Sequence, residues 1–401
     1  MNRPQLAHTL ADTLPELAHA EPGTQFENPQ LVALNEPLAN ELGLDVAWLK
    51  SDDGLKFLSG GSGGHAMAYA AHQFGQFVPL LGDGRALLLG DTAGHEIQLK
   101  GSGLTAFSRP GTDGVGAIGP MLREHLVSTF MHAVGVPTTR SLAVLSTGGT
   151  VIRQNGAVPG GIVARVAKSH LRVGTVQYAA TQSEELTQKV VAAAGFADAE
   201  EMLRTVTRRQ FDLVAHWMRL GFVHGVMNTD NVALSGETID YGPCAFTERF
   251  DGTASFSSID RQGRYAFGNQ PNIIAWNMAR LAEALYPLLG SEKVDAYVKT
   301  VQPAWDEAWA KWIGGDHDGL NAAADITTYN REHGINGEPG PIFIPRNQML
   351  QEAIDAAELR VDYTAYNELL AAVSDPYNEK AGPEWMARPE GQLPYVTFCG
   401  T

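Results

Sequence analysis

Two short segments of the sequence carry oxygen-bearing side chains at a spacing that suits phosphate chemistry. The first is HGVMNTDN, which runs from His224 to Asn231, and the second is TIDYGP, which contains Asp240. The carboxamide oxygen of Asn231 and the carboxylate of Asp240 are ligands that Mg²⁺ prefers when it bridges phosphate groups. The pair therefore predicts a site for Mg²⁺ (or Mn²⁺) and for ATP as the substrate that carries the phosphates.

The same segments match a loop pattern used by protein kinases and small-molecule kinases. That loop begins with His-x-Asp, ends with an Asn seven residues after the His, and is followed by an Asp-aromatic-Gly triplet. Here His224, Asn231 and the triplet Asp240–Gly242 keep the pattern, but Val226 stands where the catalytic Asp should be. Valine cannot accept a proton, so Asp230 is the nearest carboxylate that could replace it. A chance spacing in an ordinary loop is the alternative.

Cationic side chains that could hold phosphate precede these segments. Lys100 ends the strand-like run HEIQLK, and Glu124 lies early on the next expected helix, where its carboxylate could hold the lysine. The run VARVAKSHLR contains Arg165 and Arg172, and a guanidinium group can bind phosphate oxygens with two parallel hydrogen bonds. Each of these residues alone could be an ordinary surface side chain. Their order and spacing favour an ion pair between Lys100 and Glu124.

Two glycine-containing stretches are further candidates for contact with a nucleotide. The first is Gly82-Asp83-Gly84-Arg85, where glycines could let backbone N–H groups approach phosphate, although Gly-Asp-Gly is also an ordinary hairpin signal. The second is the polar stretch 101–116, which contains Asp113 and Gly114. A loop of this length is typical of a lid or a binding segment.

Elements that could position these residues change from strands to helices along the chain. Apolar runs at 86–89 and 97–99 flank the turn Asp-Thr-Ala-Gly, which predicts a β-hairpin. A helix is predicted from about Pro120 to Ala133, because proline suits a first helical turn and Gly135 follows the end. Further strand patterns are SLAVLS, TVIRQ and GIVARVA.

The two ends of the chain are expected to be mainly helical. Residues 1–60 predict short helices separated by Pro and Gly, 60–64 a flexible loop, and 65–73 another short helix. From about Thr181 onward apolar residues recur at helical spacing, and Gly221 ends the run that contains Trp217.

This order of elements predicts an α+β fold with two lobes, because strands with one helix come before a run of helices and no alternating βαβ pattern is present. The predicted boundaries are an N-terminal extension at 1–75, a smaller strand-rich N-lobe with the nucleotide-binding strands at 76–178, and a helical C-lobe with the catalytic and metal-binding loops at 179–401.

Composition excludes several other classes of protein. The 401 residues carry a formal net charge of −16 and no lysine-rich run, which argues against a nucleic-acid-binding surface. No apolar stretch approaches the roughly 20 residues that cross a membrane, and the N-terminus has no signal-peptide pattern, so a cytoplasmic location is expected. Cys244 and Cys399 are expected to be reduced thiols there, with a disulfide between them as the alternative.

Several segments together resemble one known family. They are QLKGSG, MLREHL, GVPTTR, VARVAKSHLRVGT, HGVMNTDN, IDYGPCAF and NQPNIIAWNMARLAEAL. This combination, which runs from about His72 to the C-terminus, resembles the selenoprotein O (SelO, also YdiU) family. The resemblance implies a protein-kinase-like fold of the pseudokinase kind, with ATP bound in a flipped orientation. It also implies a protein adenylyltransferase that moves AMP from ATP to Ser, Thr or Tyr hydroxyls of proteins and releases pyrophosphate.

The resemblance further implies roles for the matching residues. Asp230 corresponds to the proton acceptor, Asn231 and Asp240 correspond to the Mg²⁺ ligands, and Glu124 positions Lys100. The nucleotide contacts that it implies are Gly82, Gly84, Arg85, Lys100, Asp113, Gly114, Arg165, Arg172 and Asp240.

Two other functions stay open on the sequence alone. A small-molecule or protein kinase that transfers the γ-phosphate fits the loop pattern but is opposed by Val226. A non-catalytic ATP-binding pseudokinase fits the displaced carboxylate, whereas Asn231 and Asp240 speak against it because both metal-ligand positions are intact.

Overall fold

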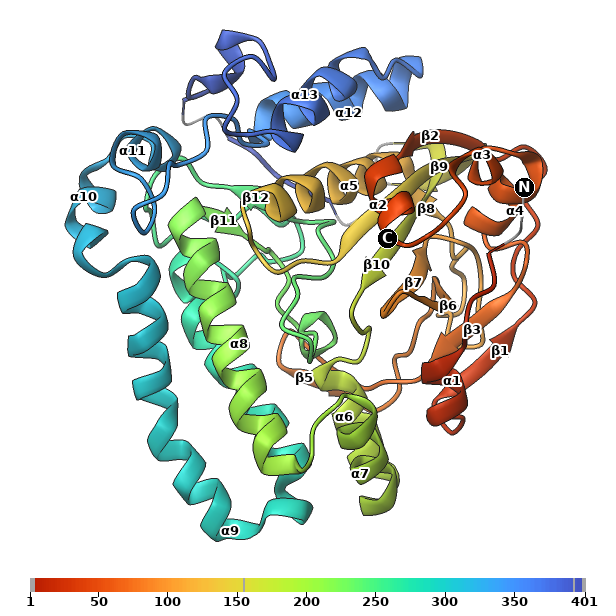
Figure 1. Ribbon diagram of the computed structural model, residues 1–401, viewed down its shortest axis with the longest axis vertical. Helices are drawn as coiled ribbons and strands as arrows, with labels where there is room; N and C mark the ends of the chain where they lie inside the picture. Colours follow the sequence, from red (N-terminus) through yellow and green to blue (C-terminus); the bar gives the residue numbers. More distant parts are fainter. Residues whose placement is uncertain (1–3, 154–155, 392–393, 399–401) are drawn as a thin grey trace.

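The computed structural model describes residues 4–153, 156–391 and 394–398, and its strand-rich part precedes its helical part along the chain (Figure 1). Within the described residues eight strands form one sheet in the order β1-β3-β6-β7-β10-β9-β2, with β8 paired to β10. These strands are β1 (Ala18–Glu21), β2 (Gln30–Leu34), β3 (Gly64–Met67), β6 (Ala86–Thr92), β7 (His95–Lys100), β8 (Gly116–Ala117), β9 (Arg140–Arg153) and β10 (Gly156–Ala167). The mixed arrangement confirms the α+β class.

The hairpin predicted over 86–99 is present as β6 and β7, which pair antiparallel. Side chains of β6 alternate between two buried clusters, with Leu88 in one and Leu87 and Leu89 in the other. Strands can be apolar on both faces only where both faces are covered. Helices α2 to α4 contribute to the cluster on one face, and α5 contributes to the cluster on the other.

Helix α5 (Ile118–Ala133) confirms the helix expected at 120–133 and packs against β9 and β10. Pro120 lies in its first turn, where the missing N–H costs no helical hydrogen bond. Gly135 follows the helix with φ 77°, a left-handed conformation that glycine adopts without strain. The helix therefore places Glu124 against the sheet.

Beyond the sheet the chain is mostly helical, as expected. Asp198 caps α8 by accepting a hydrogen bond from the backbone N–H of Glu201, and Gly221 ends it with φ 73°. Helix α9 bends at Gly290, whose φ of 72° and ψ of 173° are not helical. The α-helices of this part are α6 (Val173–Gln182), α7 (Glu184–Ala193), α8 (Ala199–Leu220), α9 (Gln270–Trp312), α10 (His317–Ala322), α11 (Ile326–His333), α12 (Asn347–Arg360) and α13 (Thr364–Ser374).

Short elements complete the helical part. The strands β11 (Phe222–Val223) and β12 (Ala245–Phe246) pair with each other. The 3₁₀ helices are η1 (Thr229–Asn231), η2 (Phe267–Asn269), η3 (Gly314–Asp316) and η4 (Glu384–Ala387).

The N-terminal region differs from its expectation. Four short helices are present, namely α1 (Thr9–Thr13), α2 (Glu36–Glu41), α3 (Val46–Leu49) and α4 (Asp52–Leu58). Strands β1 and β2 were not foreseen, and the helix predicted at 65–73 is wrong, because β3 and the hairpin of β4 (Ala71–Gln73) and β5 (Gln76–Val78) occupy that stretch. The physical reason is long-range pairing: β3 lies between β1 and β6, which supply its backbone partners.

In the described part of the chain no helix combines the length and apolar character that crossing a membrane requires. The end of the predicted strand TVIRQ, at Gln154, lies outside the described residues.

Candidate active site

The ion pair expected between Lys100 and Glu124 is present in the interior. The Lys100 Nζ donates to Glu124 Oε2 at 2.7 Å, and the two side chains are 5% and 1% exposed. Lys100 is the last residue of β7, and α5 brings Glu124 over the sheet. The other carboxylate oxygen of Glu124 accepts from the Nε of Arg165 on β10. One buried carboxylate therefore holds two cations side by side.

Asp240 joins this cluster from the helical part of the chain. Its Oδ1 accepts from the Lys100 ammonium and lies 3.6 Å from Nη2 of Arg165. Burial favours the neutral acid, but the charges of Lys100 and Arg165 outweigh it and hold the pKa of Asp240 well below its usual range, with a smaller contribution from Arg85. Asp240 is therefore an anion at neutral pH.

Asp230 and Asn231 lie on η1, beside this cluster. The Asn231 Nδ2 donates to the carbonyl of Val226 at 2.9 Å, which leaves the Oδ1 as the atom that could bind a cation. Burial raises the pKa of Asp230 to about 6, partly offset by the positive charge of Arg172. The Asp230 Oδ1 is buried and has no hydrogen-bond partner among the described residues.

Arg172 connects the loop of Asp230 to the Gly-Asp-Gly turn. Its Nη1 donates to the backbone carbonyl of Asp230 at 3.1 Å, and its Nη2 lies 4.0 Å from Oδ1 of Asp83. The guanidinium carbon lies 4.5 Å from the centre of the Tyr69 ring, within the range of a cation–π contact. Sequence reasoning missed Tyr69 and Asp83 as neighbours of Arg172; the position of Asp83 inside a candidate glycine motif was the available signal.

The residues of the kinase-type pattern have structural roles here. His224 is fully buried, its Nε2 lies 2.9 Å from the carbonyl of Ile239, and burial lowers its pKa, so the ring is neutral and holds the loop. The side chain of Val226 is buried in the main apolar cluster. The loop thus keeps the kinase-type spacing while the side chain at 226 packs in the core.

The glycines of the Gly-Asp-Gly turn are required by close packing. A Cβ on Gly82, which has φ 63°, would lie 2.3 Å from Cγ of Phe107, and one on Gly84 would lie 2.9 Å from the Phe107 carbonyl oxygen. Phe107 belongs to the stretch 101–116. The structure therefore explains both glycines by contact with that stretch, whereas Arg85 approaches the cluster through its charge on Asp240.

Asp113 lies apart from the Lys100 cluster. Its two carboxylate oxygens accept from Nη1 and Nη2 of Arg153 at 2.9 and 3.0 Å, and its side chain is 46% exposed. The neighbouring Gly114, with φ 68°, closes the loop through its carbonyl, which accepts from the N–H of Gly103. Asp113 and Gly114 are the two implied nucleotide contacts that belong to the stretch 101–116.

A metal ion bound by Asn231 and Asp240 fits the donor set. No group of three or more His, Cys, Asp or Glu side chains gathers at one point in the described parts of the chain. Mg²⁺ is usually held by one or two protein oxygens together with substrate phosphates and water, so two ligands are sufficient.

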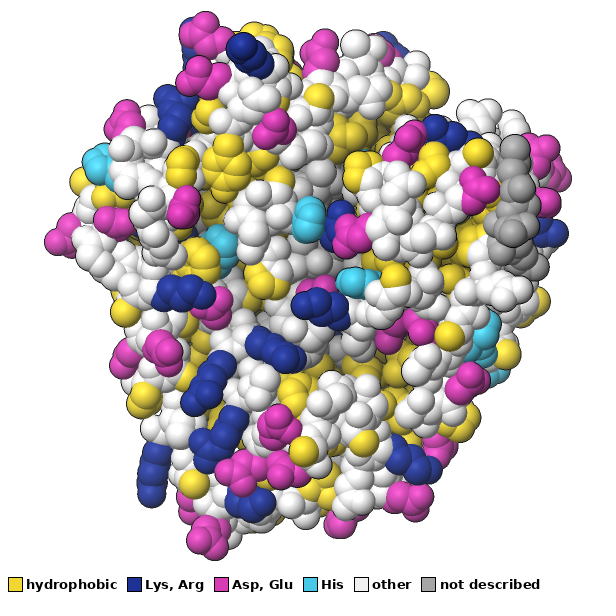
Figure 2. Space-filling model, viewed as in Figure 1, with side chains coloured by type: hydrophobic (Ala, Val, Ile, Leu, Met, Phe, Trp, Pro, Cys, Tyr) yellow, Lys and Arg dark blue, Asp and Glu magenta, His cyan; other side chains and the backbone are white. Residues whose placement is uncertain are grey.

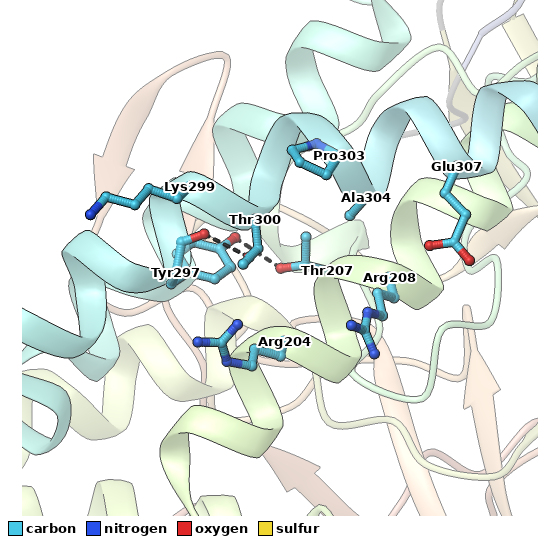
Figure 3. A pocket seen from close by; sticks show the side chains of 9 residues that line it. All are labelled: Arg204, Thr207, Arg208, Tyr297, Lys299, Thr300, Pro303, Ala304 and Glu307. Atoms are coloured by element: carbon cyan, nitrogen blue, oxygen red, sulfur yellow. Dashed lines mark hydrogen bonds between the residues drawn. The ribbon is translucent and has the colours of Figure 1, made fainter.

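Two cavities lie elsewhere, and neither is lined by a predicted site residue. A cavity of about 730 Å³ lies between the N-terminal segment and β3. One of about 230 Å³ lies between α8 and α9, in the region where Lys and Arg side chains gather on the face of Figure 2. Its lining, drawn in Figure 3, is Arg204, Thr207, Arg208, Tyr297, Lys299, Thr300, Pro303, Ala304 and Glu307.

Cys244 is the cysteine that the described residues include. Cys244 is buried, and burial raises the pKa of its thiol, so the thiolate is disfavoured. Cys399 lies outside the described residues, and the state of the pair stays a prediction.

Comparison with known proteins gives consistent matches. A family model described as "Protein adenylyltransferase SelO" matches residues 4–321, which begins well before the expected start at His72. A protein nucleotidyltransferase YdiU of Mycolicibacterium paratuberculosis is 44% identical over 476 positions, covering 97% of this chain and 96% of the relative. Proteins of the same name from Corynebacterium glutamicum (strain R) and Methylorubrum extorquens are 41% and 40% identical, covering 99% and 94% of this chain and 99% and 95% of the relatives.

Proposed function

This chain belongs to the SelO family, and from that membership we propose that it transfers AMP from ATP to Ser, Thr or Tyr hydroxyls of proteins and releases pyrophosphate. Nucleotidyl transfer is the activity that the names of the family model and of the relatives share. ATP as the nucleotide and protein hydroxyls as the acceptors are the finer part of the proposal.

One observation carries the proposal. Lys100 and Arg165 are held by Glu124 and contact Asp240. The charge of Asp240 in turn acts on Asp230. Arg172 donates to the backbone of Asp230, and the Asp230 Oδ1 is buried and has no hydrogen-bond partner among the described residues. The Nη2 of Arg165 is likewise buried without a hydrogen bond in the described structure, although it lies near Asp240. A buried polar atom without a hydrogen-bond partner destabilises the fold unless a ligand supplies the missing hydrogen bond. A triphosphate would supply acceptors for the cations, and an acceptor hydroxyl would supply a donor for Asp230.

The proposed step is a displacement at the α-phosphorus. The acceptor hydroxyl oxygen forms a bond to that phosphorus while its proton passes to the Asp230 carboxylate. The bond between the α-phosphorus and the bridging oxygen breaks, and the electron pair leaves with pyrophosphate. Lys100, Arg165 and Arg172 stabilise the charge that grows on the departing phosphates.

Asn231 and Asp240 are the residues that would hold Mg²⁺ or Mn²⁺. When bound, such an ion neutralises phosphate charge and orients the phosphates for in-line attack. Asp240 could hold such an ion as a carboxylate, because the charges of Lys100 and Arg165 keep its pKa well below the usual range.

We further propose that the fold is protein-kinase-like, with two lobes and a flipped nucleotide. The pair of Lys100 and Glu124 between a strand and a helix, opposite Asn231 and Asp240, supports the proposal because kinases use the same four parts. Val226 removes the carboxylate that a γ-phosphate transfer would use. AMP transfer therefore fits the site better than phosphate transfer.

ATP labelled at either the α- or the γ-phosphate tests the proposal. With purified protein, Mg²⁺ and a mixture of unfolded proteins as acceptors, we expect protein-bound label from the α position only. Asp240→Ala should abolish the label while the protein stays folded, because a metal ligand is lost without a core cavity. Label from the γ position only would make the chain a kinase, and no label from either position would make it an ATP-binding regulator.

A further inference from the structure

A group of aromatic and arginine side chains surrounds the hairpin of β4 and β5, next to the loop that carries Asp230. We call it the hairpin surface. Its members are Phe74, Phe77, Arg109, Arg264, Trp276 and Arg280. Two of them are large apolar side chains that are well exposed, with Phe74 at 37% and Phe77 at 43%. These two residues are on the hairpin itself or at its turn.

The hairpin is attached directly to the catalytic loop. The backbone N–H of His72 donates to the Thr229 hydroxyl at 2.7 Å, and the N–H of Phe74 donates to Oδ1 of Asn228 at 3.0 Å. The hydroxyl of Tyr265 donates to the same Asn228 oxygen at 2.5 Å. Asn228 and Thr229 immediately precede Asp230, so a molecule bound on the hairpin surface lies beside the proposed proton acceptor.

Ring contacts form two aromatic groups, and the guanidinium of Arg264 lies near a ring of each, 5.7 Å from that of Tyr265 and 5.0 Å from that of Trp276. The ring of Phe74 is 5.2 Å from that of Tyr265, and the ring of His72 is 4.8 Å from Phe77 and 5.2 Å from Trp276. These contacts fix the rings relative to one another. A rigid aromatic surface binds a partner at a low cost in side-chain entropy.

The arginines of the surface are placed to receive carboxylates. The guanidinium groups of Arg264 and Arg280 lie 5.0 and 4.9 Å from the centre of the Trp276 ring. A guanidinium stacked by its face keeps its N–H edges available for bidentate hydrogen bonds to a carboxylate. Arg109 adds a third cation and reaches the hairpin by donating to Gln73 at 2.9 Å. Glu283 pairs with Arg280 at 2.5 Å.

From these observations we propose that the hairpin surface docks the acceptor protein through a segment that carries acidic and aromatic or aliphatic residues beside the hydroxyl to be modified. The proposal rests on the proposed function, since it names the acceptor of that same site. Charge complementarity supports this occupant: the chain has a net charge of −16, whereas this surface offers three cations beside exposed rings.

Three short synthetic peptides test the preference. Each has one central serine, flanked by Glu and Phe, by Glu and Ala, or by Lys and Phe. We expect the Glu–Phe peptide to have the highest kcat/KM for AMP transfer from α-labelled ATP. Equal kcat/KM for all three peptides would overturn the proposal.

Matched variants test the surface itself. Arg264→Glu should lower kcat/KM for the Glu–Phe peptide about tenfold, the effect of one important interface contact, and should favour the Lys–Phe peptide. Phe77→Ser should lower kcat/KM for the Glu–Phe peptide but not for the Glu–Ala peptide. The controls are Arg208→Glu in the cavity between α8 and α9 and Leu359→Ser on α12, which are exposed and away from this surface. Equal effects of Arg264→Glu and Arg208→Glu would overturn the proposal.

Binding of the fluorescent peptides, measured by anisotropy without ATP, separates this proposal from the proposed function. The same preferences in binding without any transfer of label would contradict the adenylyltransferase and support the docking surface. Transfer of label without preference among the peptides would support the adenylyltransferase and contradict the docking surface. Thermal unfolding and ATP binding of each variant show that the fold and the nucleotide site are intact, and Arg264→Lys replaces Arg264→Glu if the latter does not fold.

Discussion

The side chain at position 226 is apolar and packs in the core, and the nearest carboxylate in the loop is that of Asp230. Val226 is only 7% exposed, and its carbonyl accepts from the amide of Asn231. The spacing of the loop therefore survives without a carboxylate at 226. Under the proposed function Asp230, whose backbone carbonyl accepts from Arg172, would be the proton acceptor instead. Such a displaced base would suit attack at a different phosphorus atom from the one that kinases attack.

Changing Asp230 to Asn should slow AMP transfer about 10²–10⁴-fold, the usual contribution of general-base assistance. The affinity for ATP should change little, because in the proposed function Lys100, Arg165 and Arg172 would hold the phosphates. The rate is measured with α-labelled ATP and the affinity by calorimetry. A loss of affinity as large as the loss of rate would assign Asp230 to binding instead.

At the scale of elements, Glu124 holds three segments together. Its carboxylate binds Lys100 at the end of β7 and Arg165 on β10, and the residue itself belongs to α5. Burial would raise its pKa, but the charges of Arg165 and Lys100 outweigh burial, so the pKa of Glu124 is lowered. The carboxylate fixes the two cations at the position where they could meet a triphosphate.

Glu124→Gln should lower the free energy of unfolding by about 3–5 kcal/mol, because it removes the charge of the buried carboxylate that Lys100 and Arg165 share. A matched control is Glu41→Gln, which breaks the exposed pair of Glu41 and Arg140 and should cost less than about 1 kcal/mol. Urea denaturation measures both. Similar losses in the two variants would show that burial does not strengthen the Glu124 pair.

Asp325 provides a pH-dependent contact between two helices. It caps α11 by accepting from the N–H of Thr328, and it accepts from Nη1 of Arg346 at 3.0 Å. Burial raises its pKa, but the bond to Arg346 and the charge of that residue outweigh burial, so the pKa lies below the reference value of 3.8. A lowered carboxyl pKa contributes stability above the unfolded-state pKa, and this contribution is lost as pH falls through the folded-state pKa.

Asp325→Asn removes the charge and keeps the helix cap, because asparagine also caps helices well. At pH 7 the variant should be less stable by about 1.5–3 kcal/mol, the value of a hydrogen bond to a charged group. The difference from the unmodified protein should shrink as pH falls below 3.8, which denaturation series at several pH values would reveal. A difference that is independent of pH would mean that the charge on Asp325 does not stabilise the fold.

At the scale of the whole molecule, the candidate site joins the sheet to the helical part. Lys100 and Arg165 come from strands, whereas Asp230 and Asn231 come from η1 and Asp240 from a loop in the helical part. A nucleotide with its metal would contact both parts at once. Ligand binding should therefore stabilise the molecule as a unit.

ATP with Mg²⁺ at 100 times its Kd should raise the free energy of unfolding by about 2.7 kcal/mol. Removing the metal with EDTA at the same ATP concentration should reduce this stabilisation, which thermal unfolding reports as a smaller rise in Tm. Asp240→Ala should show the same small rise with and without EDTA. An unchanged rise when EDTA is added to the unmodified protein would argue against a metal at Asn231 and Asp240.

Local features of the sequence determined much of this architecture. Two apolar runs on either side of the turn Asp-Thr-Ala-Gly predicted the hairpin of β6 and β7. A proline in the first turn and a glycine after the end predicted α5. The order of strands and helices predicted the α+β class, and the spacing of Lys100 and Glu124 predicted their ion pair. These features depend on residues close together in the sequence or on motif spacing, so the sequence alone predicts them.

Tertiary structure alone decided the rest, because those contacts join residues far apart in the chain. Residues 65–67 read as helix, yet they belong to β3 because β1 and β6 flank that strand in the sheet. The sequence likewise did not predict the pairing of the Asp113 carboxylate with Arg153, forty residues away. The position of Arg172 between Asp83 and Asp230 likewise depends on how the sheet meets the loops. Local spacing cannot specify such contacts, since backbone and charge partners are set by the packing of distant segments.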